Sequence, residues 1–167
     1  MARHFEKDLF FDQPVEALLA LFTDPRFLEA EAVMQGQTRA VCVEVERTPS
    51  RLVLRVEQAG PNRIPGGRPK EVESALHYTW DLGARACRWH RDAPHEKGIG
   101  AAGAHSLFAT PGGGTRYHMA WNLEVRIPVL GKTLERKAEP AILEGAERRA
   151  AFARRWLAEG MTHAGRS

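Results

Sequence analysis

The chain of 167 residues is 43% hydrophobic and 27% charged, and its formal net charge is +3. This composition is typical of a single soluble globular domain and excludes a disordered chain. No apolar run approaches the roughly 18 residues that a membrane-spanning helix needs, so integral membrane association is not expected. The basic residues form no stripe interleaved with aromatic side chains, which argues against a nucleic-acid partner.

The N-terminus and the cysteines suggest where the protein resides. Charged residues begin at Arg3, and no apolar signal core follows. Cys42 and Cys87 lack the spacing of a metal-binding pair. We therefore expect free thiols in a reducing cytoplasm, with a disulfide between them as the less favoured alternative.

A strand and two short helices come first. Residues 4–11 alternate loosely and form a strand, one side of which carries Phe5, Lys7, Leu9 and Phe11. A helix then begins, for which Asp12 can provide the N-cap and Pro14 fits the first turn. The sequence Thr23-Asp24-Pro25 ends this helix and caps a second short one.

Six further strands are predicted from alternating apolar and polar residues, in the ranges 39–47, 52–57, 71–82, 87–91, 104–110 and 115–127. Three prolines and three glycines in the segment 60–70 predict a mobile loop, which we expect at the mouth of a cavity. The glycine-rich segment 94–103 is expected to be a second loop, and residues 111–114 a hairpin turn.

A long amphipathic helix is predicted from just after Gly131 to about Glu159. At about 100° per residue, its apolar side gathers Leu134, Ala138, Ala141, Ile142, Gly145, Phe152, Ala153 and Trp156. Pro140 should kink this helix, because it lacks an amide donor and crowds the preceding turn. Residues 1–160 are expected to form one domain, followed by a flexible tail at 161–167.

Strands joined by short turns favour an antiparallel meander and set aside the doubly wound parallel folds. The predicted fold class is therefore α+β. A seven-stranded, curved antiparallel sheet should wrap around the long C-terminal helix, with two short helices after the first strand.

This order of elements resembles the START-like helix-grip superfamily, also called SRPBCC, which has the fold of the birch-pollen allergen. Two segments are similar to a bacterial branch of that superfamily, a domain of unknown function: Ile127-Pro128-Val129-Leu130-Gly131-Lys132 and Phe152-Ala153-Arg154-Arg155-Trp156-Leu157-Ala158. The resemblance implies a sheet that grips the helix around an apolar cavity. Members of the superfamily bind or transfer lipids, sterols and polyketides, and some cyclise or hydrolyse them.

Aromatic and sulfur-containing side chains on the predicted inner faces of the strands suit a flat apolar ligand; they are Tyr78, Trp80, Trp89, Tyr117, Met119 and Trp121. Half of them are expected to touch the cavity, and the others to fill the core. On the helix, Phe152 lies on the apolar side. Gly145 either leaves room for a ligand there or allows the helix to pack closely on the sheet.

Arg149 falls inside the apolar side of the helix, where a charge must be paired or solvated. One interpretation is an anchor for a ligand headgroup or carboxylate. The favoured alternative is an arginine that reaches the rim of the cavity or pairs with a carboxylate on a strand.

Metal binding and catalysis receive little support. His90, Asp92, His95 and Glu96 lack a recognised metal-ligand spacing, so no metal or cofactor is expected. The alternation does not fix the face on which His105 lies.

The leading function hypothesis is a binding protein for a small hydrophobic ligand, without catalysis. The alternative is an enzyme of the polyketide cyclase or aromatase kind, in which polar groups in the cavity would position a substrate. A third hypothesis, an interaction module, predicts a filled interior. The ligand and the oligomeric state are left open.

Overall fold

The structure is a computed structural model that describes residues 2–62 and 70–164, with the side chains of the last helix described as far as Gly160. The strands are β1 (Arg3–Phe11), β2 (Arg39–Arg47), β3 (Arg51–Pro61), β4 (Glu71–Asp81), β5 (Ala86–Asp92), β6 (Ile99–Ala109) and β7 (Thr115–Val125). The helices are α1 (Val15–Phe22), α2 (Pro25–Met34) and α3 (Gly131–Ala164).

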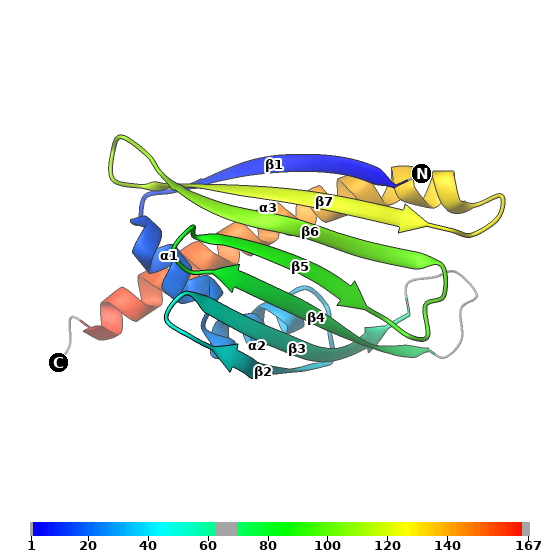
Figure 1. Cartoon of the computed structure of the whole chain (residues 1–167), viewed down its shortest axis with the longest axis horizontal. Helices are drawn as coiled ribbons and strands as arrows, with labels where there is room; N and C mark the ends of the chain where they lie inside the picture. The colour runs from blue at the N-terminus through cyan, green and yellow to red at the C-terminus, as the bar shows by residue number, and fades with distance from the viewer. Residues whose placement is uncertain (1, 63–69, 165–167) are drawn as a thin grey trace.

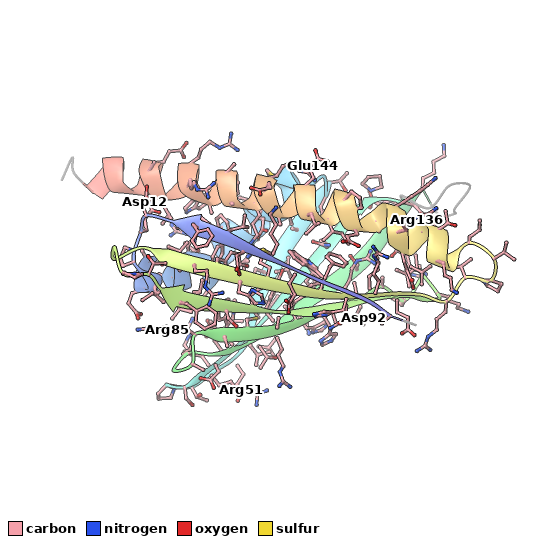
Figure 2. All side chains as sticks on the ribbon, turned by 90° about the horizontal axis from the view of Figure 1, so that it is seen from above. Asp12, Arg51, Arg85, Asp92, Arg136 and Glu144 are labelled. Atoms are coloured by element: carbon pink, nitrogen blue, oxygen red, sulfur yellow. The ribbon has the colours of Figure 1, made fainter. Side chains whose placement is uncertain are left out.

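The seven strands form one antiparallel sheet in the order β1-β7-β6-β5-β4-β3-β2. Strand β1 pairs with β7, so β1 and β2 form the two edges of the sheet. The helices α1 and α2 lie between these two strands in the chain and connect the two edges (Figure 1). The long helix α3 lies across one face of the sheet, as Figure 2 shows from above. The predicted helix-grip architecture is confirmed. None of the described helices is both long enough and apolar enough to span a membrane.

Local sequence explains the two short helices only in part. The carboxylate of Asp24 accepts a hydrogen bond from the Arg26 amide at 2.9 Å, and Pro25 opens α2, as predicted. The helix α1 is present as predicted, but its predicted cap is wrong, because the N-cap is Pro14 and no side chain, Asp12 included, caps it. The stability of α1 comes instead from burial of its apolar face, which includes Leu18 and Phe22.

The two predicted loops are shorter than expected. Strand β3 runs to Pro61, and Gly60 pairs with Val72 of β4, so pairing extends into the segment 60–70. The rest of that predicted loop, residues 63–69, lies outside the described part of the chain. Strand β6 begins at Ile99, inside the predicted loop 94–103. Its small residues form a regular ladder with β7, which satisfies their backbone groups better than a loop would.

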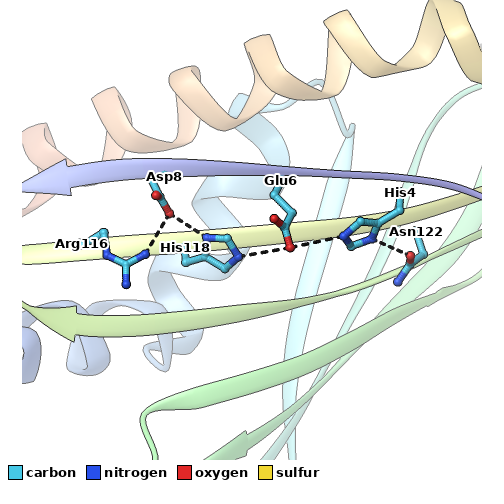
Figure 3. A network of polar contacts seen from close by, with 6 residues as sticks. All are labelled: His4, Glu6, Asp8, Arg116, His118 and Asn122. Atoms are coloured by element: carbon cyan, nitrogen blue, oxygen red, sulfur yellow. Dashed lines mark hydrogen bonds and ion pairs between the residues drawn. The ribbon is translucent and has the colours of Figure 1, made fainter.

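The outer face of β1 and β7 carries a chain of polar contacts (Figure 3). His118 contacts Asp8 at 2.7 Å and Glu6 at 3.6 Å, and Glu6 in turn contacts His4 at 3.3 Å. The hydrogen bond from His118 lowers the pKa of Asp8 below its ordinary value. Exposed pairs of this kind add little stability each, so the inner face must hold the edge strand in place.

The core fills the end of the sheet at which α1 and α2 lie. Tyr117 of β7 stacks on Phe22 with ring centroids 4.6 Å apart, and Phe27 packs against Phe22 at 5.8 Å. From α3, Phe152 stacks on Phe27 at 5.5 Å. These rings fill one end of the space between the sheet and α3. The rest of that space stays open.

Candidate functional site

The wall of the site is a row of inward-facing residues in register across six strands. Cross-strand partners lie on the same face of a sheet, and the row runs through Leu54, Tyr78, Trp89, Gly103, Trp121 and Phe5. Phe5 stacks on Trp121 with centroids 5.4 Å apart, which fixes one end of the row. The alternation of each strand therefore builds this row, of which the aromatic residues Tyr78, Trp89 and Trp121 line the space opposite α3.

Gly103 occupies the centre of this row, between Trp89 and Trp121. A Cβ atom there would lie 2.7 Å from Trp89 Nε1 and 2.1 Å from the Ala120 carbonyl oxygen. The missing side chain thus allows the indole of Trp89 to approach β6 closely. A glycine inside a strand signals such a close approach, and the sequence-based assignment of Gly103 to a loop overlooked that signal.

The opposite wall comes from small and aliphatic residues of α3, namely Leu134, Ala138, Ala141, Ile142, Gly145 and Ala146. Between the walls is a cavity of about 610 Å³. A second cavity of about 340 Å³ lies toward the start of α3 and shares Gln37, Leu134 and Ala138 with the first. The combined space is in the size range of small-molecule sites in proteins.

An ion pair between two helices lies at the closed end of the cavity. Arg149 of α3 donates to Glu31 of α2 at 2.6 Å, and their side chains are 7% and 9% exposed. The guanidinium also lies 4.7 Å above the Phe22 ring, a favourable cation–π distance. The pairing alternative predicted from the sequence therefore describes Arg149, but its partner comes from a helix and not from a strand.

Burial and charge act against each other in this pair. Burial disfavours the charge of Arg149, but Glu31 and the hydroxyls of Tyr117 and Tyr78 more than offset it, so the pKa of the guanidinium is raised. Burial raises the pKa of the Glu31 carboxyl, and the attraction of Arg149 works against that rise. Arg149 therefore stays cationic, and its Nε, which is buried without a hydrogen-bond partner, still has a proton to donate.

His105 is an inner-face residue, which resolves the question that the alternation left open. It is 2% exposed, lines the cavity, and shares a hydrogen bond of 2.9 Å between Nδ1 and the Tyr117 hydroxyl. Burial and the nearby Arg149 cation hold its pKa well below 6.5. We call Glu31, Arg149, Tyr78, His105 and Tyr117 the buried polar cluster.

Because His105 is neutral in the folded protein, we expect the free energy of unfolding to depend on pH. Because the unfolded chain binds a proton near pH 6.5 and the folded chain does not, stability should fall as the pH drops below that value. The slope for one such proton is at most about 1.4 kcal/mol per pH unit.

Urea denaturation from neutral to mildly acidic pH would measure this slope. His105→Gln should remove most of it, whereas the same change at the exposed His95 should leave it in place. Equal slopes for wild type and His105→Gln would show that other groups cause the acid sensitivity. One such group is His77, whose pKa burial also lowers.

Six of the predicted ligand-binding residues line the cavity: Tyr78, Trp89, Met119, Trp121, Gly145 and Arg149. The other three are placed in the core. Trp80 is 1% exposed and Tyr117 is fully buried, while Phe152 packs on Phe27. Gly145 lines the cavity, and its carbonyl accepts a hydrogen bond from Gln35 of α2 at 2.8 Å, so its close neighbour is a helix and not the sheet.

Glu31 was missed from the sequence, although a signal existed. Phe27, Leu28 and Ala32 recur at helical spacing on the buried side of α2, and Glu31 falls among them. A carboxylate in that position requires a buried partner, as Arg149 does on α3.

The residues considered for metal binding are not brought together. Glu96 pairs with Arg91, and His90 stacks on His77 with ring centroids 4.5 Å apart. Among the described residues there is no group of three or more His, Cys, Asp or Glu side chains able to hold a metal ion. Cys42 and Cys87 are not joined, and burial raises their pKa values to about 11 and about 12.

The model of a protein family described as "Protein of unknown function (DUF2505)" matches residues 8–157. No match is found among curated proteins. Solved structures do share the fold. TTHA0849 from Thermus thermophilus is 18% identical with a TM-score of 0.66, over 95% of this chain and 99% of that chain.

Two further structures give the same result. The Zhui aromatase/cyclase from Streptomyces sp. R1128 is 14% identical with a TM-score of 0.65, over 98% of this chain and 96% of that chain. A START superfamily protein from Mycobacterium smegmatis is 14% identical with a TM-score of 0.58, over 92% and 98%. At these identities the likeness establishes the fold alone, and the predicted START-like resemblance is confirmed.

Proposed function

We propose that this protein, which belongs to the DUF2505 family, binds a small hydrophobic ligand in the cavity between the sheet and α3. The observation that carries the proposal is the cavity of about 610 Å³, with an aromatic wall on one side and a small-residue wall on the other. An interaction module would have predicted a filled interior. The buried polar cluster at the closed end suits a ligand with a polar group at its leading end.

Binding of cis-parinaric acid, a fluorescent fatty acid, tests this proposal. The probe should bind saturably and quench the emission of Trp89 and Trp121, which line the cavity. Ala141→Phe should weaken binding about tenfold or more, because the ring would occupy the ligand volume.

The matched control is Glu144→Phe, on the solvent side of the same helix turn, where the native side chain is 75% exposed. It should bind the probe as wild type does. Equal affinities for wild type and Ala141→Phe would place the probe elsewhere and contradict the proposal.

A second candidate function is a polyketide cyclase-like enzyme. The specific observation that favours it is the convergence of Tyr78, His105 and Arg149 on one cavity. Such an enzyme would convert an aromatic polyketide analogue, and His105→Gln would then abolish conversion while the analogue still binds. An analogue recovered unchanged after binding to wild type would support the binding function instead.

A further inference from the structure

The loop between β7 and α3 ends in an exposed apolar turn. Val129 is 99% exposed and Leu130 is 56% exposed. The Leu130 amide donates to the Pro128 carbonyl at 2.8 Å, so these three residues form a γ-turn with Val129 at its apex. We call residues 128–130 the apolar tip.

The backbone of the apolar tip is strained. Val129 has a φ of 69°, in the left-handed region that L-residues rarely adopt and that suits a β-branched side chain least. A γ-turn with positive φ is itself rare and strained. No packing within the described part of the protein offsets this cost, because the Val129 side chain is exposed. Strain kept at an exposed apolar residue points to a role outside the folded chain.

Basic side chains lie on the segments next to the apolar tip. Lys132 and Arg136 lie in the first turns of α3, next to the loop. Figure 2 labels Arg136 there. Lys97 lies in the adjoining turn, where the Gly98 carbonyl accepts a hydrogen bond from the Arg126 amide at 2.6 Å. All three side chains are exposed.

The carboxylates near the apolar tip are already engaged. Ion pairs take up three of them, and the fourth accepts a hydrogen bond from a β7 amide; they are Glu96, Glu124, Glu139 and Glu135. In the described part of the chain, no ion pair engages Lys97, Lys132 or Arg136. Glu135 keeps its charge, because an amide donor does not neutralise it, but the three unpaired cations outnumber it, so the net charge of these described residues is positive.

We propose that the apolar tip, together with Lys97, Lys132 and Arg136, docks on an anionic lipid surface. Val129 and Leu130 would enter the boundary between headgroups and acyl chains, while the cations contact lipid phosphates. Two apolar side chains alone bind a bilayer weakly, so attraction between the three basic residues and anionic lipids is also required. The second cavity, whose lining includes Val125 and Leu134, lies beside this loop, and docking brings it close to the lipid.

Co-sedimentation with phosphatidylcholine vesicles, with and without about 30 mol% phosphatidylglycerol, tests the proposal. Wild type should bind only the anionic vesicles and should dissociate as salt rises. Val129→Gly keeps the turn and relieves its strain, so it should melt at or above the wild-type temperature while binding the vesicles less. Val129→Asp with Leu130→Asp should lower vesicle binding at least about tenfold.

Two variants with the same net charge distinguish the effect of the local basic residues on vesicle binding from the effect of net charge. Lys132→Glu with Arg136→Glu should reduce binding on the order of tenfold. Arg88→Glu with Arg155→Glu makes the same change in net charge at exposed sites elsewhere and should have little effect. Binding of cis-parinaric acid in solution should be unaltered in all these variants. Failure of the ligand-binding proposal can therefore be distinguished from failure of the lipid-docking proposal.

Three results would overturn the inference. The first is wild type that stays in the supernatant with both kinds of vesicle. The second is an equal loss of binding in the two charge-matched variants. The third is a concentration-dependent dimer that Val129→Asp abolishes, which would show that the apolar tip contacts a second copy of this chain.

Discussion

Replacing Glu31 with leucine should lower the free energy of unfolding by about 3–5 kcal/mol. The change leaves the Arg149 guanidinium buried beside Phe22 without its carboxylate, and an arginine does not lose its proton inside a protein. The remaining neighbours of the guanidinium are neutral hydroxyls and rings, which cannot replace the charge of Glu31. Urea denaturation would measure the loss.

Arg149→Met should cost less, about 3 kcal/mol. The stranded Glu31 carboxyl can take up a proton, and burial already raises its pKa. The double variant, with both changes, should return close to wild-type stability, since an apolar pair of similar volume often replaces a buried ion pair without loss. The coupling between the two sites is therefore expected to be large.

The control is an exposed ion pair within α3. Glu144 and Arg148 are 3.4 Å apart and well exposed, so Glu144→Leu should change stability by less than about 1 kcal/mol. If Glu31→Leu lowers the free energy of unfolding no more than this control does, the pair of Glu31 and Arg149 is solvated. The buried polar cluster would then be open to water.

The fold was predictable because its signals are periodic and local. Alternation in β7 assigns Tyr117, Met119 and Trp121 to one face, and the structure buries all three. Helical spacing likewise identified the side of α3 that faces the sheet, with the charged Arg149 inside it. These patterns reflect side-chain direction, which the backbone geometry alone determines.

The composition of the site depends on contacts between distant segments, which no local pattern encodes. The position of Arg149 on the apolar side of α3 indicates that it needs a partner. The partner, Glu31, is distant in the sequence and reaches Arg149 only because α2 packs against α3. Trp80, Tyr117 and Phe152 were candidate ligand-binding residues that the structure places in the core. The aromatic rings of α1 and α2 instead fill the space beside Tyr117 and Phe152.

Glycine-rich composition misled the prediction at β6. Small residues between 99 and 103 suggest a loop when only their sequence is considered. In the sheet residues 101–103 pair on both sides, and Gly103 lacks a side chain because the Ala120 carbonyl oxygen and the Trp89 indole lie too close to leave room for a Cβ atom. Whether a glycine marks a turn or a close approach depends on the neighbouring strands.

Gly103→Ala should therefore be among the most damaging single changes in the sheet. The added Cβ would lie 2.1 Å from the Ala120 carbonyl oxygen, which belongs to the backbone of β7 and cannot move without disturbing the ladder. A cost of about 3 kcal/mol is expected, at the upper end for overpacking. Because Trp89 must also shift, affinity for cis-parinaric acid should fall even where the variant remains folded.

Gly100→Ala, on the same strand, supplies the matched control for Gly103→Ala. Its Cβ would approach no atom closer than 3.9 Å, an ordinary contact, so stability should change by less than about 1 kcal/mol. Thermal melting and probe titration of the two variants measure both effects. If Gly103→Ala melted and bound as Gly100→Ala does, Trp89 would not lie against β6, and the aromatic wall would have to be redrawn.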